Sequence, residues 1–138
     1  MLVEDNALDV ELLEIALQKN ELPCVLNVCD DGEKALQYLY RQGAYHDVPP
    51  PDLMILDLNL PKKTGHEVLY EMSKEPSLQT IPVFVLTTTA HPKDVQRISV
   101  YPNSRILIKP TQFSEYREVI QSIRDCFLST AQNADVPQ

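Results

Sequence analysis

The chain alternates between short apolar runs and longer segments in which apolar residues recur every three or four positions. Short runs of this kind are typical of strands buried on both faces, and the longer spacing is typical of helices with one buried side. Strands are predicted at residues 1–3, 24–29, 53–56, 81–86 and 106–108. A helix is predicted after each strand, in the segments that contain Leu8, Ala35, Glu67, Pro92 and Phe113.

Five strand–helix pairs in alternation predict an α/β fold, with one parallel sheet covered by helices on both faces. We expect one domain at residues 1–130 and a polar tail at residues 131–138. The first strand has only three residues, which is short for a central strand, so we expect the natural chain to start before Met1. In open sheets of this class, functional sites form at the carboxyl ends of the strands.

Polar residues gather at those strand ends. Four of the five predicted strands are followed by such residues, which are Glu4, Asp5, Asp57, Thr87 and Lys109. Each residue has an ordinary explanation when it is taken alone, such as helix capping for Asp5 or turn chemistry for Asp57. Those explanations do not account for the position of all five residues directly after strands. We therefore expect the five residues to form one site.

The residue types of this site suit phosphoryl transfer. Three neighbouring carboxylates repel one another and need a cation, and an all-oxygen cluster suits Mg²⁺. A carboxylate such as Asp57 can act as a nucleophile and form an acyl phosphate. The ammonium of Lys109 and the hydroxyl of Thr87 would then neutralise and bind the phosphoryl oxygens.

Composition limits the class of partner and the compartment. The chain has 138 residues, is 43% hydrophobic and carries a net charge of -8 without a basic cluster, so we expect it to bind neither nucleic acid nor membrane. No apolar run is long enough to span a bilayer. Its three cysteines match no metal-site spacing, which favours reduced thiols and a cytoplasmic location.

Four motifs give the chain a family resemblance. They are VEDN at 3–6, ILDLNLPKKTG at 55–65, VLTT at 85–88 and IKP at 108–110, in this order along nearly the whole chain. Together they resemble the receiver domain of two-component response regulators. The resemblance implies a flavodoxin-like, doubly wound five-stranded sheet in the order 2-1-3-4-5 with five helices.

The resemblance also implies a role for each site residue. Asp57 would be the phosphoacceptor, and a sensor histidine kinase would supply the phosphate. Asp5 and Asp57 would ligate Mg²⁺ directly, Glu4 would act through water, and Asn59 would offer its backbone carbonyl. Thr87 and Lys109 would contact the phosphoryl group, and the peptide bond after Lys109 would be cis.

A finer resemblance concerns the segment YRQGAYHDVPPPDLMILDLNLPKK at 40–63, with its extended Pro-rich loop. This segment is similar to single-domain regulators that pair with bacterial phytochromes. No output domain follows residue 130, so the expected output is protein association or phosphorelay to a histidine phosphotransfer protein. One departure from the family is Ile106, which stands where receivers usually carry an aromatic switch residue.

Two other classes of function are open at this point. An Mg²⁺-dependent phosphatase or phosphotransferase with an Asp nucleophile would need a second Asp two residues after Asp57 as general acid. Asn59 occupies that place, which favours a switch that is not an enzyme. An inert scaffold is disfavoured because Asp57, Thr87 and Lys109 are all present.

The last predicted helix has an unusually wide apolar face. Phe113, Ile120 and Phe127 mark the stripe expected to face the core, while Val119 and Cys126 lie at its edge. One sheet face should not need so wide an arc. We therefore expect a symmetric homodimer through this helix and the neighbouring fifth strand and fourth helix, although a wholly intramolecular core would also explain the pattern.

Overall fold

The computed structural model describes residues 1–88 and 91–135 and contains one parallel sheet. In this part of the chain the strands are β1 (Leu2–Val3), β2 (Val28–Cys29), β3 (Met54–Asp57), β4 (Val83–Thr87) and β5 (Ser104–Ile108). They are arranged in the order β2-β1-β3-β4-β5, and every neighbouring pair is parallel. The predicted flavodoxin-like order 2-1-3-4-5 is therefore confirmed.

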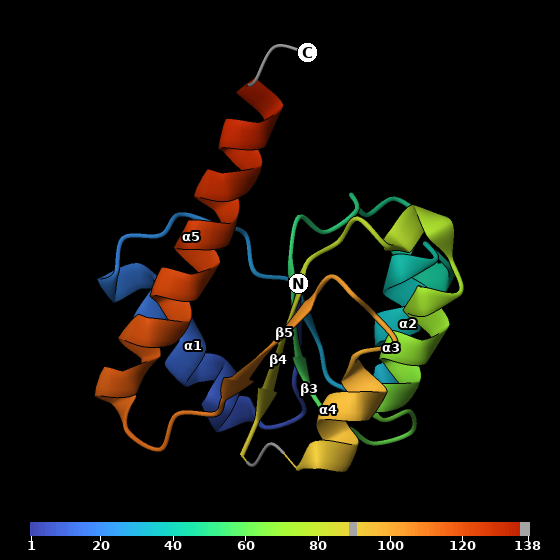
Figure 1. The fold of residues 1–138 in the computed structure, drawn as a ribbon, viewed down its shortest axis with the longest axis horizontal. Coiled ribbons are helices and arrows are strands. Elements are labelled where there is room, and N and C mark those ends of the chain that lie inside the picture. The colour runs from blue at the N-terminus through green and yellow to red at the C-terminus, as the bar shows by residue number, and fades with distance from the viewer. Residues whose placement is uncertain (89–90, 136–138) are drawn as a thin grey trace. The chain divides into compact units, whose positions relative to one another are not determined.

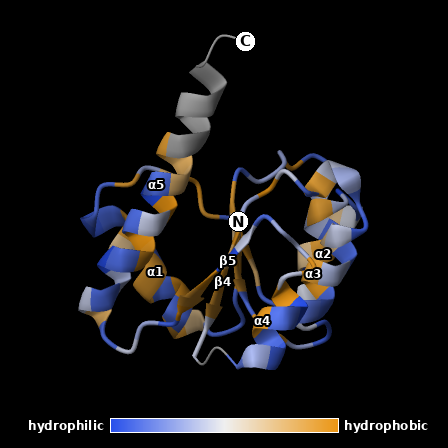
Figure 2. Cartoon of the chain, in the orientation of Figure 1, coloured by the Kyte–Doolittle hydropathy of each residue, from blue (hydrophilic) through white to orange (hydrophobic). Residues whose placement is uncertain are grey.

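Each strand is followed by a helix, as the alternating pattern predicts. Within the described residues the α-helices are α1 (Ala7–Lys19), α2 (Gly32–Leu39), α3 (Gly65–Ser73), α4 (Pro92–Ile98) and α5 (Tyr116–Asp135). Figure 2 shows mostly hydrophobic strands, whereas the helices carry hydrophobic and hydrophilic residues side by side. None of the helices in the described ranges is long and apolar enough to cross a membrane.

The chain divides into two compact units. The first unit comprises residues 1–10 and 26–109, and the second comprises residues 11–25 with the segment from 110 onward. The first unit contains the whole sheet together with α2, α3 and α4, which lie side by side in Figure 1. Its core is built from alternate residues of the central strands, such as Met54, Leu56, Val83 and Val85, and from the apolar sides of these helices.

The end of β3 is held in place by the start of α3. Thr64 caps this helix by accepting a hydrogen bond from the backbone N–H of Glu67 at 3.2 Å. A Cβ atom at Gly65 would lie 2.5 Å from the backbone oxygen of Asp57 and 2.8 Å from the Cα of Leu58. Glycine is therefore needed here, because it lets α3 begin directly against the last residue of the strand.

The second strand is shorter than its sequence suggests. Only Val28–Cys29 pairs with β1, whereas Cys24 and Val25 are exposed. Pro23 precedes them and cannot donate a backbone hydrogen bond to a neighbouring strand. The prediction of a strand at 24–29 is thus wrong for its first half, while Cys29 is buried in the core.

Two further expectations need correction in the C-terminal part of the chain. No cis peptide bond occurs among the described residues, so the expected cis bond between Lys109 and Pro110 is wrong. Helix α5 begins at Tyr116 and runs to Asp135, and residues 136–138 lie outside the described part. Phe113, expected to face the core, lies before α5 in a 3-10 turn (Phe113–Glu115) and is exposed, with the ammonium of Lys19 5.2 Å from the centre of its ring.

One of the two residues expected at the edge of the apolar arc on α5, Val119, is already covered, whereas Cys126 is partly buried. Val119, expected to be available to a second copy of the chain, is only 4% exposed in the single chain. Its neighbours Tyr116, Ile120 and Ile123 are buried as well. The width of the arc is therefore no reason to expect a dimer through Val119.

Tyr101 offers a test of the core of the first unit. Its side chain is 0% exposed, and its hydroxyl group lies 2.6 Å from the backbone oxygen of Leu78 and 2.5 Å from that of Ile81. Tyr101→Phe removes this hydroxyl group, so the carbonyl groups of Leu78 and Ile81 lose a hydrogen-bond donor. We expect the free energy of unfolding, measured in urea, to fall by about 1–3 kcal/mol. Tyr70→Phe, on an exposed ring, is the control, and equal midpoints for both variants would contradict the expectation.

Candidate functional site

The acidic residues predicted to meet at the strand ends do meet. Glu4 and Asp5 follow β1, and Asp57 is the last residue of the neighbouring strand β3. One carboxylate oxygen from each of these three residues lies within 4.8 Å of the other two. Because Asp5 is exposed while Glu4 and Asp57 are buried, the cluster is open to solvent on one side only.

Asp57 has a fixed position at the end of a buried strand. Asp57 is 7% exposed, and the backbone N–H of Asn59 donates a hydrogen bond to its Oδ1 at 3.2 Å. The other carboxylate oxygen, Oδ2, lies 3.5 Å from the ammonium of Lys109. The β3 ladder, the glycine contact of α3 and these two donors together set the direction of the carboxylate.

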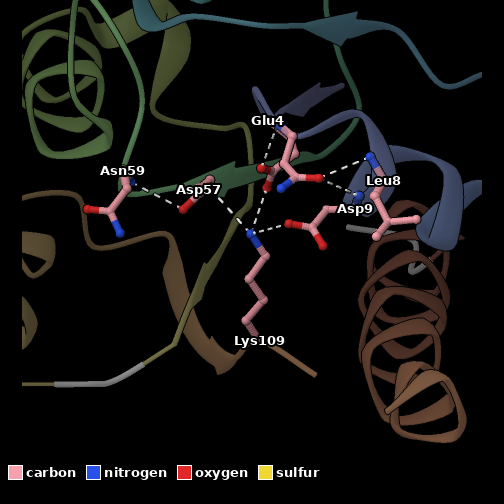
Figure 3. A network of polar contacts seen from close by, with 7 residues as sticks. Glu4, Leu8, Asp9, Asp57, Asn59 and Lys109 are labelled. Carbon is pink, nitrogen blue, oxygen red and sulfur yellow. Dashed lines mark hydrogen bonds and ion pairs between the residues drawn. The ribbon is translucent and has the colours of Figure 1, made fainter. Parts of the chain in front are cut away.

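Lys109 reaches the cluster from the residue after β5. Its backbone N–H donates to the backbone oxygen of Thr87 at 2.7 Å, and its Nζ lies 3.1 Å from Oε2 of Glu4 (Figure 3). Burial lowers the pKa of Lys109, but its hydrogen bonds to Asp9 and Glu4 and the charge of Asp57 raise that pKa by more. The net pKa is above the ordinary value, so this side chain is an ammonium at every physiological pH.

The buried position of Glu4 disfavours the charge of its carboxylate. Glu4 is 4% exposed, and burial together with the charge of Asp57 raises its pKa to about 7, although Lys109 opposes this shift. The backbone N–H of Asn6 donates to its Oε1 at 3.1 Å. Three carboxylates beside the single ammonium of Lys109 leave an excess of negative charge in this cluster, which a hard divalent cation with oxygen ligands would relieve.

Sequence reasoning missed Asp9, which provides the shortest ion pair of Lys109. Its Oδ2 lies 2.8 Å from Nζ, closer than the oxygens of Glu4 and Asp57. In the sequence Asp9 looks like an ordinary acidic residue in the first turn of a helix. Its partner Lys109 lies far along the chain, so the sequence carried no signal of this pairing.

The side chain of Asn6, rather than that of Asp5, caps the first helix. Its Oδ1 accepts hydrogen bonds from the backbone N–H groups of Leu8 at 3.0 Å and Asp9 at 3.1 Å. Asp5 is therefore not required for capping, and its carboxylate belongs to the acidic cluster. This separates the two explanations that the sequence alone left open for Asp5.

Thr87 and Asn59 lie beside the acidic cluster. Thr87 is the buried last residue of β4, one position beyond the residue that pairs with Asp57. Both Thr87 and Asn59 line a polar cleft of about 490 Å³ that extends between α3 and α4. In that cleft His66 of α3 lies 2.9 Å from Asp94 of α4, an interaction not anticipated from the sequence.

Ile106, expected to replace an aromatic residue, lies in the sheet. Ile106 pairs with Val85 in the sheet and is partly buried against the core of the first unit. His91 stands directly before α4, with Pro92 as the first helical residue. Neither residue adds a charged group to the cluster.

Comparisons with known proteins agree on one family. The sequence model of the response regulator receiver domain matches residues 1–121. Response regulator Rcp1 of Synechocystis sp. is 37% identical over 130 residues, which cover 94% of this chain and 88% of that protein. The crystal structure of the phosphorylated cyanobacterial phytochrome response regulator RcpA has a TM-score of 0.83 at 38% identity, covering 94% of this chain and 92% of its own. The Mn(2+)-bound form of Rcp1 has a TM-score of 0.81 at 38% identity, with coverages of 94% and 93%.

The raised pKa of Glu4 predicts an unusual dependence of stability on pH. The pKa of Glu4 is about 7 in the folded chain, compared with an ordinary value of 4.5. Its protonated form is favoured by folding, so its contribution to stability is fully present below pH 4.5 and is lost as the pH rises through 7. Glu4→Gln cannot titrate. In metal-free buffer, we expect its free energy of unfolding relative to wild type to rise between pH 4.5 and 8 by on the order of 3 kcal/mol.

Urea denaturation at several pH values in the presence of EDTA measures this difference. Glu33→Gln, at an exposed position of α2, controls for the loss of one acidic group and should show no such trend. A difference between Glu4→Gln and wild type that stays constant across this pH range would contradict the expectation.

Proposed function

Since the chain belongs to the response regulator receiver-domain family, we propose that it is a single-domain response regulator operated by phosphorylation of Asp57. The observation that carries this proposal is the position of Asp57, fixed at the end of a buried central strand beside Glu4, Asp5 and Lys109. A rigid carboxylate with one oxygen near an ammonium can be phosphorylated and then retained in one orientation.

We assign the divalent cation of this reaction as Mg²⁺, which would neutralise charge on the phosphoryl oxygens. Asp5 and Asp57 would bind it directly, Glu4 through water, and Asn59 through its backbone carbonyl. The all-oxygen cluster and its excess negative charge support this assignment, as does the Mn(2+)-bound form of the relative Rcp1. In the same proposal Lys109 and the hydroxyl of Thr87 contact the phosphoryl group.

The partner we propose is a sensor histidine kinase of the phytochrome class, met in the cytoplasm. Support comes from the phytochrome response regulator RcpA, which matches 94% of this chain. The phosphorylated form would act by binding another protein or by passing its phosphate to a histidine phosphotransfer protein. Asn59, in the place where phosphatases with an Asp nucleophile carry their general acid, makes the enzymatic alternative the weaker one.

Incubation with acetyl phosphate and Mg²⁺ tests the phosphoacceptor. We expect intact-mass spectrometry to show a gain of about 80 Da, one phosphoryl group on a carboxylate, in the wild-type chain. Asp57→Asn should abolish this gain because it removes the nucleophile, and EDTA should abolish it in the wild type. A mass gain that persists in Asp57→Asn would place the phosphate on another residue, and turnover of small phosphoesters would favour the phosphatase.

A symmetric homodimer remains a proposal, now assigned to the exposed apolar residues of α4 and β5. Val95 of α4 and Ile108 of β5 are 45% and 57% exposed, and a two-fold contact would cover such residues. We expect sedimentation at micromolar concentration to show a dimer for the wild type and a monomer for Ile108→Glu. A wild-type monomer with the same sedimentation as Ile108→Glu would disprove it.

A further inference from the structure

We propose that Asp9 is a positioning residue that competes with the phosphoryl group for Lys109 and so sets how readily the phosphorylated state forms. This inference rests on the proposed function of Asp57. It assigns Asp9 a role through Lys109, without contact to the reacting carboxylate. The consequence would be a site whose balance between resting and phosphorylated states depends on α1.

The ammonium of Lys109 lies at different distances from three carboxylates. Its Nζ lies 2.8 Å from Oδ2 of Asp9, 3.1 Å from Oε2 of Glu4 and 3.5 Å from Oδ2 of Asp57 (Figure 3). An ammonium has three N–H groups, and three carboxylates already surround this one. In the resting chain Lys109 is thus paired most closely with Asp9 and least closely with the phosphoacceptor.

Asp9 is held in its position by hydrogen bonds at the start of α1. Its backbone N–H donates to Oδ1 of Asn6, whose own backbone N–H donates to Glu4. Asp9 therefore extends from the capped first turn of a helix rather than from an unsupported loop. The Asp9 carboxylate is 26% exposed and the Lys109 side chain 15%, so solvent screens their ion pair only in part.

The electrostatic consequence follows from the sign of each charge. Phosphorylation of Asp57 adds negative charge beside Lys109, and Asp9 opposes it by repulsion and by holding the ammonium. The same negative charge attracts a divalent cation to the cluster of Glu4, Asp5 and Asp57. Asp9 should accordingly raise the affinity of the site for the cation and lower its affinity for a phosphoryl anion.

Asp9→Asn tests this with beryllofluoride, a non-covalent analogue of the phosphoryl group, at saturating Mg²⁺. We expect the variant to bind beryllofluoride about fivefold more tightly, the size of effect typical of a partly exposed ion pair, as followed by fluorine NMR. Its affinity for Mg²⁺ alone, measured by calorimetry, should fall. A structural defect would lower both affinities, so opposite changes identify an electrostatic role.

Two matched variants complete the experiment. Asp9→Glu keeps the charge and should bind both ligands like the wild type. Glu11→Gln removes an exposed charge of the same helix that has no ion pair among the described residues, and it should change neither affinity appreciably.

The outcomes separate this inference from the proposed function. If the wild type binds beryllofluoride and Asp9→Asn binds it equally or more weakly, the role of Asp9 is disproved while that of Asp57 stands. If the wild type binds none in the presence of Mg²⁺, both are disproved.

Discussion

The charge balance of the site depends on one ammonium. Lys109 contacts three carboxylates: Glu4 directly after β1, Asp9 in the first turn of α1, and Asp57 at the end of β3. Without this positive charge, the carboxylates would repel one another at a place where burial already raises the pKa of Glu4. The backbone N–H of Lys109 donates a hydrogen bond to the backbone oxygen of Thr87 in β4. The residue that balances these charges is therefore attached to the sheet.

The parallel sheet explains why these groups meet at all. Glu4, Asp57 and Lys109 are separated by tens of residues in the chain, but each stands at the carboxyl end of a strand, and all those ends share one edge. Burial of β3 on both faces then removes the freedom that a loop carboxylate would keep. Orientation of the acceptor and neutralisation of charge, the two requirements of phosphoryl transfer, thus come from the same architecture.

Apolar runs and their alternation along the chain were sufficient to predict a parallel sheet and the meeting of Glu4, Asp5 and Asp57, because parallel topology places strand ends together, whereas the strand order came from the resemblance to receiver domains. The weaker predictions depended on details that a pattern does not contain. Cys24 and Val25 are apolar yet exposed beyond Pro23, and Val119 is buried although the helical projection placed it at an edge. Asp9 could not be recognised because its partner Lys109 is distant in sequence, and only three-dimensional proximity distinguishes it from other acidic residues of α1.

The junction between α3 and α4 has a mechanical consequence. Gly65 packs against the backbone of Asp57 with no room for a methyl group, and the next residue, His66, is bound to Asp94 of α4. A displacement of the end of β3 would therefore act on α3 directly, and on α4 through the contact between His66 and Asp94. Because Ile106 of β5 is aliphatic, this contact would connect the acceptor to α4 without an aromatic switch residue.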